Sequence, residues 1–354
     1  MSATHIVLEV SSAAGRPPFG GIPSLIRRQV EALLAVDPNT RYSLRYKFSR
    51  WRKGDLFRPQ QGHAPTPIVV GPLGTWVARD ASLIHFMSGF VARAGSALKL
   101  ATIYDLTHLR YPEWVSDHHR ERRQRQLEDM VRAADHIVTT SEFTAGDVCD
   151  AFRIGRDRVH SVLAGVDLST FHPLPPSEIA AVRATYGDYV LAIGLLTPRK
   201  NFIALVEAMR ALPDLRLVLV GNSSHGSRAF FDAVERCRLR DRVLHLQGVP
   251  QQELVRLING ARVFAAPSLH EGFGLVVLEA LACGVPIAAY PVTGPKDVVI
   301  HGKVGHLSDD LREAAMQALT MDRAICREYA CGFSWEASAH QFVNNIAAAR
   351  AQLS

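Results

Sequence analysis

The chain has 354 residues, of which 47% are hydrophobic and 21% charged, and its formal net charge is +6. This composition is typical of a soluble globular protein of about two domains, and it excludes disordered, collagen-like and coiled-coil proteins. No apolar run reaches the roughly 18–20 residues of a membrane span, and the short run at residues 6–8 does not resemble a signal peptide. Five scattered cysteines favour reduced thiols in a cytoplasmic protein.

Short β-branched runs alternate with longer amphipathic stretches along the whole chain. A first series of predicted strands comprises residues 5–10, 82–86, 101–104, 136–140 and 159–163. A second series comprises residues 189–193, 215–220, 243–246, 263–266 and 286–289. Helical patterns cover residues 24–36, 202–212, 253–259 and a final stretch from about 336 to 354. This alternation predicts an α/β fold with parallel sheets covered by helices on both faces.

Two such series predict two doubly wound domains. Three prolines within residues 173–176 interrupt any continuing element, so we predict a boundary there, with residues 1–172 and 173–335 forming the two domains. The final helix, at about 336–354, is expected to pack back on the first domain. Ligands of doubly wound sheets bind beyond the carboxyl ends of the strands, so two facing domains would enclose a deep cleft.

Two segments, residues 41–53 and 118–125, are strongly basic. In the first, aromatic and aliphatic residues alternate with basic and polar ones, which predicts a strand with one basic face. One interpretation is a solvated face; the other is attraction to an anionic membrane surface or to a pyrophosphate-linked acceptor. No pattern of a nucleic-acid-binding motif accompanies these charges.

Two loops precede predicted helices with residues suited to phosphate. Gly20 and Gly21 come before the helix at 24–36, where exposed N–H groups could hold an anion; the alternative is an ordinary turn. Arg199 and Lys200 lie between the strand at 189–193 and the helix at 202–212. Two cations there could clamp a diphosphate, and the alternative is a solvated basic turn.

The segment 267–286 is the most informative. Glu271 follows a predicted buried strand, and Glu279 lies eight residues later within the otherwise apolar helix 275–282. A buried carboxylate needs donors, which the diol of a sugar or ribose could supply; the alternative is an arginine partner. The turn from Gly272 to Gly274 exposes N–H groups at the start of this helix, a second candidate phosphate site.

Glu271 and Glu279 with the intervening residues resemble the E-x7-E signature of retaining glycosyltransferases of family four, the group 1 glycosyl transferases with the GT-B fold. The resemblance covers nearly the whole chain. It also includes residues 20–22, 110–113, 140–142, 165–167, 199–201, Gly221 and residues 282–286. It implies two Rossmann-like domains and transfer of a sugar from a nucleotide diphosphate donor with retention, without a metal or a cofactor.

The resemblance assigns roles residue by residue. Glu271, with Arg199 and Lys200 at the diphosphate, would lie at the reacting end of the donor, and Glu279 would bind its ribose. The remaining donor-binding positions are Gly20, Gly21, Gly221, His270, Gly272, Phe273, Gly274 and Leu275. The segment 289–295 resembles members that use GDP-mannose.

One position departs from the family pattern. Relatives usually have histidine before Asp105, whereas this chain has Tyr104, with His108 four residues later. Tyrosine cannot alternate between donor and acceptor nitrogens as histidine does, so the contact to the transferred sugar could differ. Tyr104 and His108 are therefore candidates for acceptor or sugar contact. Asp105 is a candidate catalytic residue on the acceptor side, and its alternative is a turn or cap residue.

The chain has no D-x-D triplet and no histidine set with metal-ligand spacing, so no metal site is predicted. The sequence thus predicts a glycosyltransferase of bacterial-type polysaccharide synthesis that uses a nucleotide sugar, with GDP-mannose the favoured donor, and a saccharide or lipid-linked acceptor. We expect it in the cytoplasm, with peripheral contact with the inner membrane face as one interpretation of its basic segments. The alternatives are a nucleotide-sugar epimerase, a phosphorylase or a non-catalytic sugar-binding module.

Overall fold

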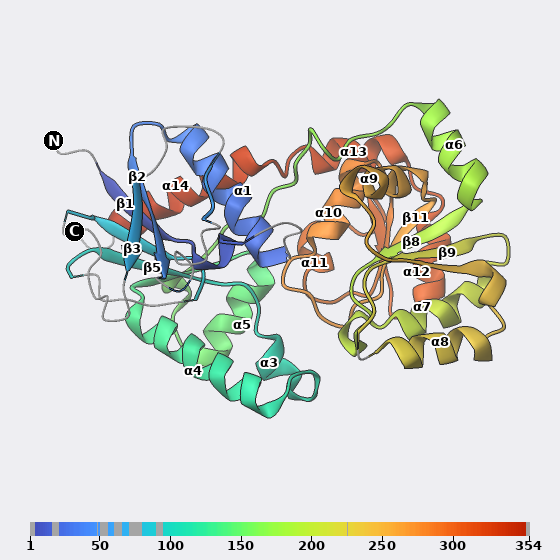
Figure 1. The fold of residues 1–354 in the computed structure, drawn as a ribbon, viewed down its shortest axis with the longest axis horizontal. Helices are drawn as coiled ribbons and strands as arrows, with labels where there is room; N and C mark the ends of the chain where they lie inside the picture. The colour runs from blue at the N-terminus through green and yellow to red at the C-terminus, as the bar shows by residue number, and fades with distance from the viewer. Residues whose placement is uncertain are drawn as a thin grey trace. The chain divides into compact units, whose positions relative to one another are not determined.

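The chain divides into two compact units, each with its own parallel sheet (Figure 1). The computed structural model describes residues 4–15, 21–47, 49, 56–59, 66–70, 80–89, 95–224 and 226–351. Unit 1 comprises Met1–Gly165 and Trp335–Ser354, and unit 2 comprises Val166–Ser334. The predicted α/β class is confirmed.

The boundary between the units lies seven residues before the predicted one. The Val166 N–H donates to the Phe333 carbonyl at 2.8 Å, and Phe171 is buried with its carbonyl accepting from Arg327 at 2.9 Å. These contacts place residues 166–172 in unit 2. The prolines of residues 173–176 instead precede and begin α6 (Pro176–Tyr186), where proline suits the first helical turn.

Unit 1 contains a seven-stranded parallel sheet in the order β3-β2-β1-β4-β5-β6-β7. The strands are β1 (His5–Glu9), β2 (Arg41–Lys47), β3 (Thr66–Val70), β4 (Leu83–Phe86), β5 (Leu98–Ile103), β6 (His136–Thr139) and β7 (Val159–Ser161). The strand order reverses between β1 and β4. Such a switch point is where doubly wound sheets open a crevice at the carboxyl ends of their strands.

Helices cover both faces of this sheet (Figure 1). α1 (Gly21–Val36) and α14 (Trp335–Ala351) pack against each other on one face. α4 (Asp117–Ala133) and α5 (Glu142–Phe152) contribute to the core on the other, and the short α3 (Thr107–Arg110) packs against α4. The periodic apolar stripe of each helix forces this arrangement, since it must be removed from water.

α14 is held to unit 1 by specific contacts. The Gln341 side chain accepts a hydrogen bond from the Leu163 N–H at 3.0 Å, and Asn345 donates to the Ser161 carbonyl at 3.0 Å. Phe342 stacks on His85 with ring centroids 4.9 Å apart. None of the helices in the described ranges is both long and hydrophobic enough to span a bilayer.

Unit 2 contains a six-stranded parallel sheet in the order β10-β9-β8-β11-β12-β13, which reverses between β8 and β11. Its strands are β8 (Tyr189–Ile193), β9 (Arg216–Val220), β10 (Val243–Leu246), β11 (Val263–Ala266), β12 (Ile287–Ala289) and β13 (Gly305–Leu307). α7 (Phe202–Ala208), α8 (Ser227–Arg236) and α12 (Leu311–Ala318) lie on one face, and α9 (Gln251–Gly260), α10 (Leu275–Ala282) and α13 (Arg323–Ala330) on the other (Figure 1). α11 is short (Pro295–Val298).

Three features of the sheets differ from expectation. β3 and β13 were not predicted, because β3 contains a proline that only an edge strand tolerates and β13 has three residues. The strand β2 was predicted, but the prediction that it has an exposed basic face is wrong. β2 lies between β1 and β3, so Ser43 and Arg45 are buried, and only the first residue, Arg41, is exposed.

Gly221 directly follows β9, where the backbone after the neighbouring strand β8 approaches closely. A Cβ at Gly221 would lie 1.9 Å from the Gly194 carbonyl oxygen, so Gly221→Ala should destabilise unit 2 by about 3 kcal/mol, the upper range for over-packing. Gly248→Ala is the control: φ is +63° there and a Cβ would meet nothing within 4 Å, so only the backbone cost of about 1 kcal/mol applies. Urea unfolding measures both. An equal loss of unfolding free energy in Gly221→Ala and Gly248→Ala would contradict a steric role for Gly221.

Candidate functional site

Glu271 lies beyond the carboxyl end of β11, between the two cations that follow β8. Its Oε2 is 3.0 Å from Arg199 Nη1, and its Oε1 forms a close ion pair with Lys200 Nζ. Ser268 Oγ donates to the same Oε1 at 2.8 Å. The side chain is only 14% exposed. Burial raises the pKa of Glu271, but Lys200 and Arg199 outweigh it and lower the pKa to about 2, so the group is a carboxylate.

The backbone joins the same two loops. Arg199 Nη1 donates to the His270 carbonyl at 2.6 Å, and the Leu269 N–H donates to the Arg199 carbonyl at 2.9 Å. The loop after β8 and the loop after β11 are therefore one bonded unit on either side of the switch point. The structure brings together Arg199 and Lys200 with His270 and Glu271, two pairs of neighbouring residues that lie 71 positions apart in the sequence.

The loop after β12 supports this cluster, and sequence reasoning missed its role. The Glu271 N–H donates to Thr293 Oγ1 at 3.0 Å, and this hydroxyl is 2.9 Å from His270 Nδ1. A Cβ at Gly294 would lie 2.7 Å from Glu271 Cβ, so only glycine permits this approach. Ser268 was missed as well. The segment 289–295 was noted only for its resemblance to other sequences, and no local pattern reveals which loop it touches.

The glycine turn leads from Glu271 into α10. Phe273 is buried, and Gly274 has φ +91°, a left-handed conformation that favours glycine, immediately before Leu275 begins the helix. Gly272 is partly buried. Gly221, one strand away from β8, also lies at the carboxyl edge of the sheet. The predicted donor-binding positions of unit 2 thus gather along one edge.

Glu279 projects from the middle of α10 without a protein partner. Its side chain is partly buried, and the carboxyl group forms no hydrogen bond or ion pair with any residue that the structure describes. Burial raises the pKa of Glu279 to about 8. The alternative interpretation, in which an arginine pairs with Glu279, is therefore wrong as far as the described residues are concerned. This carboxyl group is held in a state that additional hydrogen-bond donors would stabilise.

The polar candidates of unit 1 lie after β5. Tyr104 is buried, and its hydroxyl donates to the Met87 carbonyl at 2.8 Å. Asp105 Oδ1 accepts from the Thr107 N–H at 3.0 Å, the local turn contact that was its alternative role. His108 is buried in α3; burial lowers its pKa, and so does the nearby Arg123.

A buried carboxylate that the sequence analysis did not consider lies at the end of β1. The two oxygens of Glu9 accept from the Ser11 and Ser88 N–H groups, each at 3.1 Å. Burial raises the pKa of Glu9, while Ser11 and Arg45 oppose that shift. Glu9 joins the loops after β1 and β4 and so fixes the switch point of unit 1.

Gly21 is the exposed first residue of α1, so this helix starts three residues earlier than predicted, and Gly20 lies outside the described residues. A cleft between the two units, and a common site for Gly21, Tyr104, Asp105, His108 and the unit 2 residues, stay predictions.

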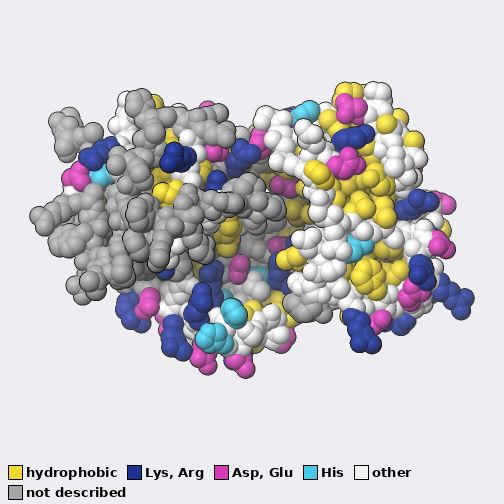
Figure 2. All heavy atoms as spheres, viewed as in Figure 1, with side chains coloured by type: hydrophobic (Ala, Val, Ile, Leu, Met, Phe, Trp, Pro, Cys, Tyr) yellow, Lys and Arg dark blue, Asp and Glu magenta, His cyan; other side chains and the backbone are white. Residues whose placement is uncertain are grey.

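The basic segments do not form uniformly basic surfaces in the described ranges. On α4, Arg120 pairs with Asp117 at 2.8 Å and Arg125 with Glu121 at 3.0 Å. Figure 2 accordingly shows acidic and basic side chains interspersed over this part of unit 1. In the first segment, Arg41 pairs with Asp80 at 2.7 Å, whereas residues 48 and 50–53 lie outside the described residues.

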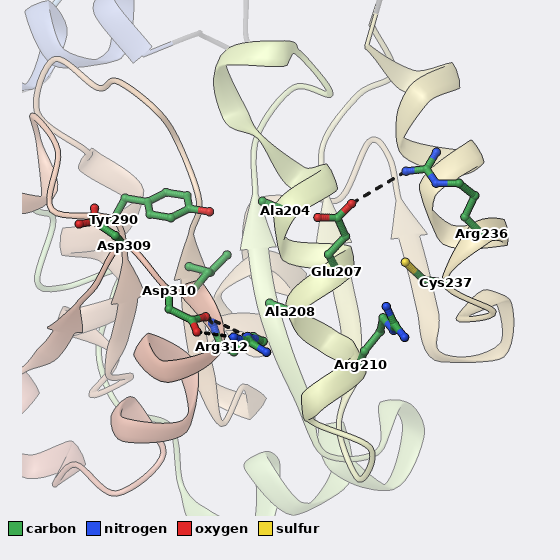
Figure 3. A pocket seen from close by; sticks show the side chains of 11 residues that line it. Ala204, Glu207, Ala208, Arg210, Arg236, Cys237, Tyr290, Asp309, Asp310 and Arg312 are labelled. Atoms are coloured by element: carbon green, nitrogen blue, oxygen red, sulfur yellow. Dashed lines mark hydrogen bonds and ion pairs between the residues drawn. The ribbon is translucent and has the colours of Figure 1, made fainter.

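Unit 2 also has an open groove of about 630 Å³ lined by α7, α8 and the start of α12 (Figure 3). Glu207 and Arg236 point toward each other from α7 and α8, 4.0 Å apart, and Asp310 pairs with Arg312 at 2.6 Å. No predicted site residue lines this groove. The described residues contain no group of three or more histidine, cysteine or acidic side chains placed to hold a metal.

Glu279 and Glu271 should affect stability in opposite ways as pH changes. Between pH 4.5 and about 8 the unfolded chain releases the Glu279 proton while the folded one keeps it, so stability falls as pH rises. Glu279→Gln should therefore be more stable than the wild type at pH 8, by on the order of 3 kcal/mol, with the gap closing toward pH 4.5.

Glu271→Gln is the matched comparison. In the wild type, the folded-state pKa of Glu271 is about 2, so its carboxylate stabilises the fold above pH 4.5, and this stabilisation is lost as the pH falls toward 2. The variant lacks this stabilisation and should therefore be less stable than the wild type at neutral pH. Thermal unfolding of the ligand-free protein across pH measures both. A pH-independent gap for either variant would contradict the assigned ionisation.

Comparisons with known proteins point to one family. Residues 181–331, all within unit 2, match the family model described as Glycosyl transferases group 1. The chain is 28% identical over 290 residues to O-antigen chain mannosyltransferase B of Escherichia coli, covering 76% of this chain and 75% of that protein. It is 36% identical over 194 residues to D-inositol 3-phosphate glycosyltransferase of Xylanimonas cellulosilytica, covering 51% of this chain and only 46% of that protein.

Solved structures support the fold over nearly the full length. Sucrose-phosphate synthase from Thermosynechococcus elongatus aligns with a TM-score of 0.71 at 23% identity, covering 99% of this chain and 100% of that one. HepE of Anabaena in complex with UDP aligns with a TM-score of 0.74 at 19% identity, covering 97% and 99%. The chain has the GT-B fold, and its residues 181–331 match the family model of the group 1 glycosyltransferases.

Proposed function

We propose that this protein is a retaining glycosyltransferase that moves a hexose from a nucleotide diphosphate donor, without a metal ion. The observation that supports this most strongly is the cluster of Arg199, Lys200 and Glu271 at the carboxyl edge of the unit 2 sheet. Glu279, whose carboxyl group has no partner among the described residues, lies on α10, the helix that follows the loop of Glu271. The cluster supplies two cations for a diphosphate, and Glu279 supplies an acceptor for hydroxyl donors.

Arg199 and Lys200 would bind the donor diphosphate. Both cations pair with the same carboxylate, which leaves the cluster one positive charge in excess, so a diphosphate adds anionic oxygens that Glu271 alone cannot provide. When the bond between sugar and phosphate breaks, negative charge grows on the leaving phosphate. Preorganised cations stabilise that charge without a divalent ion.

Glu279 would bind the ribose of the nucleotide. Two adjacent hydroxyl groups are good donors to a carboxylate, and their hydrogen bonds favour its ionised form. The raised pKa of Glu279 reflects burial without such donors. Ribose binding would therefore remove a cost that the ligand-free protein bears at neutral pH.

Glu271 would lie at the reacting end of the donor, where positive character develops at the anomeric carbon. Its low pKa keeps it ionised across the physiological range, so it is suited to electrostatic stabilisation and not to proton transfer. The acceptor hydroxyl would attack from the face that the phosphate leaves, and the leaving phosphate would take its proton. This sequence of events retains the anomeric configuration.

GDP-mannose is the proposed donor and a saccharide or lipid-linked saccharide the proposed acceptor. The mannosyltransferase relative supports the sugar and the role in polysaccharide synthesis. The structures of HepE in complex with UDP and with UDP-glucose show that a protein of the same fold takes a different base, so the nucleotide must be tested directly. Peripheral membrane contact remains part of this proposal only through the lipid-linked acceptor.

Replacing both Arg199 and Lys200 with alanine should weaken binding of GDP by about 2–4 kcal/mol, because each charged contact contributes about 1.5–3 kcal/mol and the two overlap. Calorimetry with GDP and UDP measures this, and wild-type affinity should be unchanged by EDTA. Arg210→Ala/Arg228→Ala, which removes two exposed cations of unit 2, is the control and should bind normally. Binding of neither nucleotide by the wild type would overturn the proposed function.

Glu271 and Glu279 should separate kinetically. Glu279 contacts a part of the donor that does not react, so Glu279→Gln should mainly raise the donor KM. Glu271 acts where charge develops, so Glu271→Gln should lower kcat by about 10²-fold or more. Steady-state rates with donor varied at saturating acceptor distinguish them, and the reverse pattern would exchange the assigned roles.

A further inference from the structure

A single threonine connects the loop after β12 with the loop after β11. The two strands pair side by side, with Ala266 opposite Ala289, so the loops that follow them leave the carboxyl edge of the sheet together. Thr293 lies in the second loop, is 7% exposed, and contacts two consecutive residues of the first loop, His270 and Glu271. One buried hydroxyl group therefore serves both residues.

The two hydrogen bonds of this hydroxyl group run in different directions. The Glu271 N–H can only donate, so Thr293 Oγ1 accepts from it at 3.0 Å. His270 Nδ1 lies 2.9 Å from the same oxygen, and it donates or accepts according to the tautomer of the ring. The Thr293 side chain forms no other hydrogen bond with a residue in the described ranges. The hydroxyl proton is therefore donated to His270 Nδ1.

This donation determines the tautomer of His270, whose side chain is buried as well. If Nδ1 carried a proton, Thr293 Oγ1 would accept two hydrogen bonds and its own proton would be buried without an acceptor, which is costly. Nδ1 therefore accepts, and a neutral imidazole that accepts at Nδ1 carries its proton at Nε2. In this tautomer Nε2 donates a hydrogen bond and cannot take up a proton.

The backbone beside Thr293 fixes the position of its hydroxyl group. Gly294 has φ +84°, and a Cβ there would lie 2.7 Å from Glu271 Cβ and 3.1 Å from the Phe273 carbonyl oxygen. Pro295 then begins α11. Because the two loops are in van der Waals contact at Gly294, the distances from Thr293 to His270 and Glu271 are set by the fold.

We propose that Thr293 is a positioning residue of the donor site, which holds the Glu271 main chain and keeps His270 in the Nε2–H tautomer. This inference rests on the proposed function, which it deepens by making His270 a hydrogen-bond donor to the nucleotide sugar and not a base. That role agrees with a transfer in which the leaving phosphate takes the acceptor's proton. Thr293 acts through Glu271, whose carboxylate stabilises the transition state, so loss of the hydroxyl should lower kcat more than it raises KM.

The ligand-free protein tests the tautomer without any substrate. In protein labelled with ¹⁵N at histidine, the NMR shifts of the two ring nitrogens distinguish an N–H group from an acceptor, and His270→Gln assigns the signals. We expect Nε2–H in the wild type and in Thr293→Ser, which keeps the hydroxyl. Thr293→Val keeps the shape without the hydroxyl and should lose the uniform Nε2–H signature. A protonated Nδ1 in the wild type, or a tautomer that Thr293→Val leaves unchanged, would overturn the proposal.

Turnover of GDP-mannose tests the positioning role. Thr293→Val should lower kcat about tenfold, the size of one neutral hydrogen bond, and Thr293→Ser should restore most of the rate. The donor KM should change by less than about threefold. Thr102→Val is the control, because it removes a buried threonine hydroxyl that lies 2.6 Å from His85 Nε2 in unit 1. This variant should keep the wild-type kcat and the wild-type His270 signals.

Equal losses of kcat in Thr293→Val and Thr102→Val would show a merely structural effect and would also overturn the positioning role. Failure of the proposed function gives a different result. A wild type that does not turn over GDP-mannose would contradict the proposed donor, whereas the tautomer of His270 is decided in the ligand-free protein.

Discussion

The ion pairs of Glu271 with Arg199 and Lys200 are the constraint on which the rest of unit 2's edge depends. They join two loops that follow strands on opposite sides of the switch point. The backbone hydrogen bond from Leu269 to Arg199, and the hydrogen bond from the Arg199 side chain to the His270 carbonyl, repeat the same connection. Because the carboxylate is largely shielded from water, each contact is stronger than it would be on the surface. The glycine turn and the start of α10 take their positions from this junction.

In unit 1, the loops on the two sides of the switch point are joined by a different set of contacts. Its switch point is also bridged by a buried glutamate, Glu9, but the donors are the backbone N–H groups of Ser11 and Ser88. Backbone donors fix loop geometry without adding positive charge, whereas the partners of Glu271 in unit 2 are the charged side chains of Arg199 and Lys200. The two edges therefore differ in chemistry although both sheets reverse their strand order at one point: backbone N–H groups hold the glutamate of unit 1, and two cations hold the glutamate of unit 2.

Much of this arrangement was predictable from sequence, because strand and helix periods are local and the E-x7-E segment is contiguous. Arg199, Lys200 and Glu271 were expected at one edge since parallel strands bring their carboxyl ends together. Thr293 and Gly294 were missed because their contact with Glu271 is set by a loop whose path no local pattern specifies. The prediction of a basic face on β2 was wrong because the burial of a strand depends on its neighbours in the sheet. The hydrogen bond from Tyr104 to the Met87 carbonyl was not predictable because it joins residues that only the fold brings together.

The return of α14 to unit 1 has a consequence for how the protein is made. One face of the first sheet is completed by a helix that follows unit 2 in the chain, so a nascent chain that has produced only residues 1–165 lacks the partner of α1 and of His85. Unit 2 is continuous and can fold as it emerges from the ribosome. We therefore expect the second unit to reach its native state first, leaving the first exposed to chaperones until translation has passed α14.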